Sequence, residues 1–398
     1  MTVSVDRARF DTDLDLWSEE VLLSPYPHYD TLRDMGPAAY LTRYDVWILT
    51  RYEQVKSALS DWETFSSSHL GGMPLNAVGR EILRGGALLL DPPEHGPSQK
   101  LVTDALRPRS IRGVLGSIEA RCDAVVSELL EQSTFDGVTE FAHDLPKHVV
   151  MDLIGWPAHG RDQMIDWGKA IFTIIGPENQ RLLDCLPQLA QAKQYLQEIA
   201  VEGNIAPDSF GASLFDAVRR GELAEEDVPL MLLGYLGPAL DTTINGVGNL
   251  LWLLAEHPSQ WALVHADPSL VRSAFLEALR LESPVQFFGR ATTRDVDLGD
   301  GLVIPADSRV LLSYAAANRD PRHYPNPDRF DVRRNPTDTL SFGFGVHACA
   351  GRNLAMMEAE SLFTALAKKV STIELVGEPK RLVHNITRGL ASLPVRIS

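Results

Sequence analysis

The chain has 398 residues, 44% of them hydrophobic, which is enough to bury an extensive core. Lysine and arginine total 37 against 53 aspartates and glutamates, a formal net charge of −16. This excess of acid argues against a broad basic surface for nucleic acid or for an anionic membrane.

The N-terminal residues and the cysteines indicate where in the cell the protein is located, and the absence of linkers indicates how many domains it has. Residues 1–7 lack the apolar core of a signal peptide or membrane anchor, and no linker or repeat divides the chain. We therefore expect one domain over residues 1–398 and no membrane attachment. The three cysteines, Cys122, Cys185 and Cys349, are widely separated, which favours a reducing compartment over a disulfide framework. The predicted location is the cytoplasm.

Helical periodicity dominates the chain, and the strand-like runs are short. In chain order we predict a strand at 46–50, helices at 117–132, 184–198, 227–256 and 268–281, a strand at 309–312, a helix at 351–369, and strands at 373–375 and 395–397. The predicted fold class is mainly α with a minor β region.

The helix predicted at 227–256 is about 45 Å long at the usual rise and apolar on nearly all sides, so it is expected to cross the centre of the protein. Asp241 and Asn245 lie near its middle, where hydrocarbon would penalise them most. They favour a buried helix over a membrane span. Pro238 cannot donate a backbone hydrogen bond to Gly234, so we expect a bend and a preformed groove there.

A glycine-punctuated loop, residues 342–351, places Cys349 directly before the last long helix. A helix N-terminus presents unpaired N–H groups that favour a thiolate, the form of cysteine that ligates metals. The glycines let the backbone approach a flat cofactor. The other interpretation is a small buried side chain, the usual role of an isolated cysteine.

This loop resembles the haem-thiolate signature of the cytochrome P450 family, Phe-x-x-Gly-x-His/Arg-x-Cys-x-Gly, and matches every fixed position. The resemblance runs from Pro25 to Pro394 and implies the cytochrome P450 fold, with haem b between the long central helix and the cysteine loop. It implies that Cys349 ligates the iron of a monooxygenase, whose electrons come from NAD(P)H through a ferredoxin and a ferredoxin reductase. Cys122 and Cys185 lack this context and are interpreted as structural.

The resemblance also assigns residues around the haem. We expect the cofactor to be held by His95, Gln99, Arg290, Phe342, His347, Cys349 and Gly351. Gln99 stands where the family has an arginine, so one charged contact to a haem propionate is missing. Glu277 and Arg280 match the family's buried Glu-x-x-Arg pair, and Arg329 is predicted to complete that triad. An exposed salt bridge is the alternative for this pair.

Asp241 and Thr242 match the family's acid–alcohol pair on the central helix. By resemblance, Asp241 relays protons for oxygen activation and Thr242 holds water by hydrogen bonding. The alternative is that Thr242 bonds back to the carbonyl of Pro238 while Asp241 caps a kink.

Several stretches resemble a subgroup that oxidises para-substituted benzoates, which favours a small aromatic substrate and oxidative O-demethylation of a methoxyphenol or methoxybenzoate. The predicted pocket residues are His69, Phe172, Ile175, Gly234, Gly237, Pro238, Val285, Phe287, Phe288 and Leu390. The subgroup binds carboxylate through an arginine and serines, where this chain has His69, Gly234 and Gly237. A neutral phenol is therefore at least as good a candidate as a benzoate.

Other functions stay open from sequence alone. A terpene, macrolide or fatty acid is the main rival substrate class. A peroxide-driven peroxygenase would dispense with Asp241 and Thr242, and a haem sensor would carry an output domain. A basic patch for an acidic ferredoxin is predicted from Lys100, Arg107, Arg109, Arg112 and Arg352. The alternative is that these are scattered surface cations.

Overall fold

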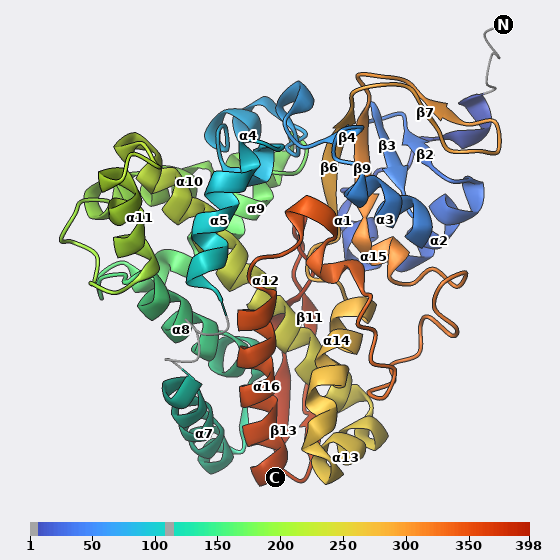
Figure 1. The fold of residues 1–398 in the computed structure, drawn as a ribbon. Coiled ribbons are helices and arrows are strands. Elements are labelled where there is room, and N and C mark those ends of the chain that lie inside the picture. Colours follow the sequence, from blue (N-terminus) through green and yellow to red (C-terminus); the bar gives the residue numbers. More distant parts are fainter. Residues whose placement is uncertain (1–6, 108–114) are drawn as a thin grey trace, which may run out of the picture.

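Helices make up most of the computed structural model, which describes residues 7–107 and 115–398 (Figure 1). The helices are α1 Glu19–Leu23, α2 Tyr26–Met35, α3 Tyr52–Ser60, α4 Ala77–Ile82, α5 His95–Ala105, α7 Leu115–Gln132, α8 Asp144–Ile154, α9 Met164–Thr173, α10 Gln180–Ile199, α11 Phe210–Arg219, α12 Val228–Glu256, α13 Pro258–Ala266, α14 Val271–Leu281, α15 Tyr314–Ala317 and α16 Arg352–Lys369. Every helix predicted from periodicity is present, with ends shifted by a few residues. A 3₁₀ turn, Pro268–Leu270, precedes α14, and the Asp267 carboxylate caps it by accepting from the Ser269 N–H at 3.1 Å.

The largest sheet lies at one side of the molecule, beside α1, α2 and α3 (Figure 1). Its strands, in spatial order, are β1 Asp11–Thr12, β2 Ala39–Leu41, β3 Val46–Leu49, β9 Arg309–Ser313, β6 Phe287–Thr292 and β4 Phe65–Ser66. β9 runs parallel to β3 and antiparallel to β6, with Phe288 opposite Leu312. This sheet carries the Phe287–Phe288 pair predicted to face the substrate.

Three small sheets complete the β region. They contain β10 Ile373–Leu375, β13 Pro394–Ile397 and β5 Thr134–Asp136, then β11 Lys380–Arg381 with β12 Leu390–Ser392, and β7 Val296–Asp297 with β8 Val303–Ile304. β13 is the middle strand of its sheet, because it pairs antiparallel with both β10 and β5. The predicted strands at 46–50, 309–312, 373–375 and 395–397 are confirmed.

The central helix α12 is buried along most of its length, as its composition predicts. It passes behind α16 in the view of Figure 1 and continues through Pro238 without a break. Gly246 allows close packing on α14, because a Cβ at this position would lie 2.9 Å from Leu279. Asn249 donates its side-chain N–H to the carbonyls of Glu282 and Arg388 and so ties the helix to both neighbours. No helix within residues 7–107 or 115–398 is long and apolar enough to cross a membrane.

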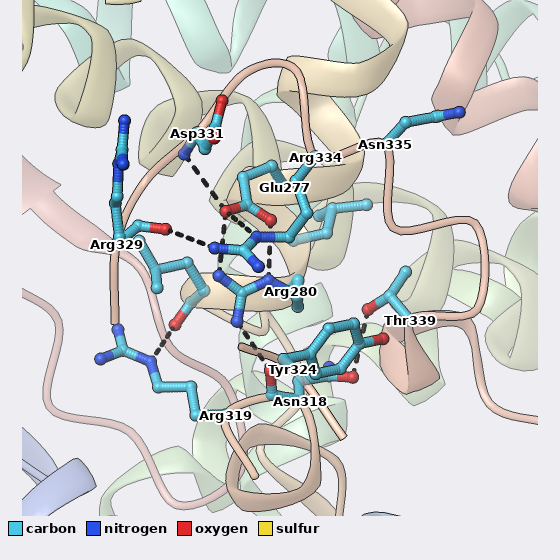
Figure 2. A network of polar contacts seen from close by, with 12 residues as sticks. Glu277, Arg280, Asn318, Arg319, Tyr324, Arg329, Asp331, Arg334, Asn335 and Thr339 are labelled. Atoms are coloured by element: carbon cyan, nitrogen blue, oxygen red, sulfur yellow. Dashed lines mark hydrogen bonds and ion pairs between the residues drawn. The ribbon is translucent and has the colours of Figure 1, made fainter. Parts of the chain in front are cut away.

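The predicted Glu277–Arg280 pair is fully buried, but its third member is Arg334 and not Arg329 (Figure 2). Arg280 donates two hydrogen bonds to the Glu277 carboxylate, at 2.7 and 2.9 Å. Arg334 donates from Nε to the same carboxylate at 2.9 Å. The prediction of Arg329 was wrong because the irregular segment after residue 325 folds back. Arg329 contributes only its carbonyl, which accepts from Arg334 at 3.3 Å.

Candidate active site

A deep cavity lies between α12, the cysteine loop, α5 and β6. On α12 it is lined by Gly234, Pro238 and Thr242, which are four residues apart and therefore share one face of the helix. Phe342 and Cys349 line the opposite wall. The walls bring together residues that are separated by more than one hundred positions in the chain.

The cysteine loop holds its shape through backbone geometry that depends on glycine. Gly343 and Gly345 both have positive φ, 67° and 71°. A Cβ at Gly345 would lie 2.4 Å from the Leu59 carbonyl oxygen, so only glycine lets the loop pack on α3. The Cys349 N–H donates to the Phe342 carbonyl at 2.8 Å, and α16 begins three residues later at Arg352. The loop therefore places the Cys349 thiol at the N-terminus of α16, where it faces the cavity.

Burial raises the pKa of the Cys349 thiol, and the backbone N–H groups of Gly351 and Arg352 oppose that rise. The sulfur is open to the cavity although protein surrounds the rest of the side chain. The other two cysteines differ. Cys122 is buried in the core, and Cys185 donates to the Leu182 carbonyl at 3.2 Å. Neither lines the cavity.

Two histidines and an arginine form the polar end of the cavity. His95 on α5 and His347 in the cysteine loop have ring centroids 4.2 Å apart, and both line the cavity with Arg290 from β6. Burial lowers the pKa of His95 to about 4, and the neighbouring His347 and Arg290 add to this. Gln99, one helical turn after His95, lines the same end.

This end of the cavity fits an anion. The buried Nε2 of His347 has no hydrogen-bond partner in the part of the chain that the structure describes, and it lies 3.8 Å from the Asp91 carboxylate. Arg290 is 4% exposed and has no acidic partner among the described residues. The two carboxylates of a haem b would satisfy both groups, and Cys349 offers a sulfur ligand to its iron. The residues therefore fit the cofactor that the sequence predicts, and His95, Gln99, Arg290, Phe342, His347, Cys349 and Gly351 all line the cavity.

Asp91 lies behind His347 at the polar end of the cavity and is held there by several hydrogen bonds. Its carboxylate accepts hydrogen bonds from the Ser67 N–H at 2.9 Å and from the Ser66 and Ser68 hydroxyls at 2.5 and 2.8 Å. Burial alone would raise the pKa of Asp91, but His347 and these hydrogen bonds hold it well below its usual value. A stable negative charge therefore lies beside His347.

The acid–alcohol pair is split between the cavity and the protein interior. Thr242 lines the cavity and donates its hydroxyl to the Pro238 carbonyl at 2.7 Å. This is the back-bonding expected as the alternative role, but the hydroxyl oxygen keeps its lone pairs to accept from water. Asp241 is 1% exposed and accepts from the Asn245 amide at 3.2 Å. It is not part of the cavity wall.

Half of the predicted substrate residues line the cavity. They are Phe172, Gly234, Pro238, Val285 and Phe288. The rings of Phe172 on α9 and Phe288 on β6 are parallel within 3°, with centroids 6.4 Å apart. Two parallel aromatic rings therefore line the part of the cavity that is predicted to hold the substrate.

The other predicted substrate residues lie outside the cavity wall. Phe287 points to the opposite face of β6, where it packs against Trp17 at 5.5 Å, because successive strand residues alternate. Gly237 is turned toward Ile171 on α9, one step around the helix from Pro238. Ile175 and Leu390 belong to the hydrophobic core. His69 is directed outward and its Nε2 lies 2.6 Å from the Asp307 carboxylate.

Several cavity residues were not predicted from sequence. Met73, Leu88, Val102 and Tyr314 line it, as does Glu358 on α16. The sequence could have predicted Glu358, since it is an acid on the same helix face as Leu354 and Ala355. The others come from irregular segments or distant helices, which periodicity does not place.

A neighbouring carboxylate offsets part of the positive charge of the predicted basic patch. Lys100 and Arg107 both pair with Asp104, at 2.6 and 2.5 Å. Arg352 lies over the Phe342 ring, 5.3 Å from its centroid. Arg109 and Arg112 lie outside the described residues.

The chain is similar to known proteins over nearly its whole length. The family model described as Cytochrome P450 matches residues 192–393. The chain is 36% identical to cytochrome P450 CYP199A2 of Rhodopseudomonas palustris, over 97% of this chain and 94% of that protein. It is 32% identical to vitamin D(3) 25-hydroxylase of Pseudonocardia autotrophica, over 96% of each. The structure of cytochrome P450 CREJ in complex with (4-ethylphenyl) dihydrogen phosphate has a TM-score of 0.86 and 26% identity, over 95% of this chain and 98% of that one.

Proposed function

The chain belongs to the cytochrome P450 family and is a monooxygenase, and from that premise we propose that it oxidises a small, neutral aromatic ether. The observation that carries the proposal is the composition of the cavity wall. Arg290 is the only lysine or arginine that lines it among the described residues, and it lies beside His95 and His347 at the polar end. A substrate carboxylate would therefore be desolvated without a cation to pair with.

The substrate side of the cavity favours an aromatic ring. Phe172, Phe288, Val285 and Leu88 supply apolar surface, and parallel phenylalanine rings favour a flat partner through offset stacking. The relative CREJ was solved with a para-substituted phenyl compound, and several stretches of this sequence resemble the benzoate-oxidising subgroup. These likenesses support a small aromatic over a terpene, macrolide or fatty acid.

The proposed reaction is oxidative O-demethylation. Haem, when bound, would supply the activation of dioxygen, and Cys349 would hold its iron through a thiolate sulfur that favours O–O cleavage. One oxygen atom enters a methyl C–H bond of the methoxy group, and the other leaves as water with two electrons and two protons. The resulting hemiacetal breaks its C–O bond and releases formaldehyde and the phenol. We assign the electrons to NAD(P)H, a ferredoxin reductase and a ferredoxin.

In this proposal Thr242 and Asp241 deliver the two protons that the reaction consumes. The Thr242 hydroxyl donates to Pro238, so its oxygen is left to accept a hydrogen bond from a water in the cavity. Asp241, the residue before Thr242 on α12, lies inside the protein and is the acid that supplies protons from the far side of this helix. The surrounding apolar wall excludes other water.

Optical titration of the ferric holoprotein tests the substrate class. We expect 4-methoxyphenol to shift the iron to high spin with an affinity at least about tenfold higher than that of 4-methoxybenzoate, because only the acid leaves a charge unpaired. A terpene and a fatty acid serve as comparison ligands. Tighter binding of the benzoate, or a response to the comparison ligands alone, would reject the neutral aromatic substrate.

Thr242→Ala tests the alcohol. We expect the product formed per NAD(P)H consumed to fall at least about fivefold, while the haem spectrum and substrate affinity stay unchanged. Thr242→Ser keeps the hydroxyl and is expected to retain most of the coupling. Unchanged coupling in Thr242→Ala, or an equal loss in both variants, would show that the hydroxyl has no part in proton delivery.

A further inference from the structure

The segment of residues 69–74 forms part of the cavity wall and has an irregular backbone. Leu70, Gly71 and Gly72 all have positive φ, between 54° and 77°. A Cβ at Gly72 would lie 1.9 Å from the Ser67 carbonyl oxygen, so this turn requires glycine. Met73, which follows the turn, is 1% exposed and lines the cavity. An irregular segment has no strand ladder to hold it, so its position depends on other contacts.

Arg309, the first residue of β9, makes three of those contacts, and Arg80 also donates to the Pro74 carbonyl, at 3.2 Å. Its Nη2 donates to the Leu70 carbonyl at 2.6 Å, and its Nη1 donates to the carbonyls of Gly72 and Pro74, both at 3.2 Å. Gly72 and Pro74 are the two residues on either side of Met73. The guanidinium thus holds the backbone on both sides of a cavity residue.

The charge of Arg309 is not used in an ion pair within the described part of the chain. Burial lowers its pKa, and the nearby Arg80 adds to this, so placing a cation here costs free energy. The planar guanidinium has five donors spread over two outer nitrogens and Nε, so it can reach carbonyls further apart than the three donors on the single nitrogen of a lysine. The geometry therefore explains an arginine at this position better than charge alone.

The far side of Met73 is also fixed. Its carbonyl lies against Gly289 on β6, where an added Cβ would come within 2.6 Å of the Met73 oxygen. Gly289 follows the cavity residue Phe288, so Met73 and Phe288 are held by adjacent backbone. A shift of the segment would change the width of the cavity beside the aromatic wall.

We propose that Arg309 is a positioning residue that sets how tightly the cavity fits a ring, because it holds the carbonyls that flank Met73. His69, the residue of this segment predicted to contact substrate, instead ties the outer edge of the turn to Asp307. The inference concerns the shape of the cavity and does not depend on which substrate is oxidised.

Two azoles that bind haem iron test this proposal in the ferric holoprotein. Imidazole fills little of the cavity, whereas 4-phenylimidazole places a phenyl ring in it, and both are read from the optical spectrum. In Arg309→Met we expect the dissociation constant of 4-phenylimidazole to rise at least about fivefold and that of imidazole to stay within about twofold. Arg309→Lys, with fewer donors, is expected to fall between. Arg294→Met is the matched control, because it removes an exposed arginine whose ion-pair partner is Asp61 at 3.5 Å, and its ratio of the two constants should equal that of the parent.

An unchanged ratio in Arg309→Met, or equal weakening of both azoles, would overturn the proposal. If Arg309→Met does not retain haem, Arg309→Lys is combined with Met73→Ala in a double-mutant cycle. Arg309 acting through Met73 predicts non-additive effects on 4-phenylimidazole binding, and additive effects reject it. Since azoles bind whether or not they are oxidised, failure here is distinguishable from failure of the aromatic-ether proposal.

Discussion

Replacing Arg334 with alanine is expected to lower the free energy of unfolding by about 2–3 kcal/mol, because it removes one of the two cations hydrogen-bonded to a carboxylate that water cannot reach, while Arg280 stays paired with it. Glu277 and Arg280 have fully buried side chains, and Arg334 itself is 16% exposed. Arg334 also donates to the carbonyls of Pro325 and Asn326, at 2.8 and 3.0 Å. The same change therefore loosens the segment that folds over the buried pair.

Arg329→Ala is the matched control for Arg334→Ala. Arg329 is exposed, and in Figure 2 its side chain points away from Glu277. Its carbonyl, the group that accepts from Arg334, survives the substitution. We expect a change of less than about 0.5 kcal/mol. Urea unfolding followed by circular dichroism compares the two variants, and similar losses, or a larger loss in Arg329→Ala, would contradict the assignment of Arg334.

The second large effect concerns Glu358, an unpaired acid in the interior. It is 1% exposed, its Oε1 has no hydrogen-bond partner in the described part of the chain, and burial raises the pKa of its carboxyl to about 8. Its neighbours do not help it to ionise. Burial also raises the pKa of Tyr235 on α12 and takes that of Cys122 on α7 to about 12, so both stay neutral.

Stability should therefore fall as pH rises. Between the ordinary glutamate pKa of 4.5 and about 8, the folded protein keeps the Glu358 proton while the unfolded chain loses it. Folding then takes up a proton, so each pH unit in this window costs about 1.4 kcal/mol and the whole window about 5 kcal/mol. Below the window this contribution is fully present, and above it is lost.

Glu358→Gln removes this titration, since the amide is neutral at every pH. We expect the variant to match the parent near pH 5 and to be more stable by several kcal/mol near pH 8.5. Glu360→Gln is the control, because Glu360 lies on the same helix but pairs with Arg272 at the surface. Urea unfolding at the two pH values measures the difference. The same fall in stability with pH in parent and Glu358→Gln would refute a buried neutral carboxyl.

The parts of the fold that sequence predicts are those encoded locally. Periodicity found the long helices, and the loop around Cys349 was found because ten adjacent residues specify it. Arg334 was missed because Arg329 and Arg334 lie in one irregular segment, and only its folded path decides which side chain reaches Glu277. No local pattern encodes that path.

Only half of the predicted substrate residues line the cavity, again because local sequence does not decide which way they point. Phe287 and Phe288 are adjacent, and only the pairing of β6 with β9 decides which one faces inward. His69 precedes a turn whose positive φ angles direct it outward, to Asp307. Gly234 and Pro238 on α12 were placed correctly, whereas Gly237 on the same helix and His69 beside the turn were not.

The pairing of β13 has a consequence for the order in which the protein can be made. β5, at residues 134–136, cannot complete its sheet until residues 394–397 have been synthesised, because β13 lies between β5 and β10. Val395 and Ile397 on β13 are buried in the same core as the central helix. A chain without residues 394–397 would thus expose an unpaired strand edge and an open core. The helical half therefore closes only when β13 inserts between β5 and β10, so its folding depends on a contact between two distant parts of the chain.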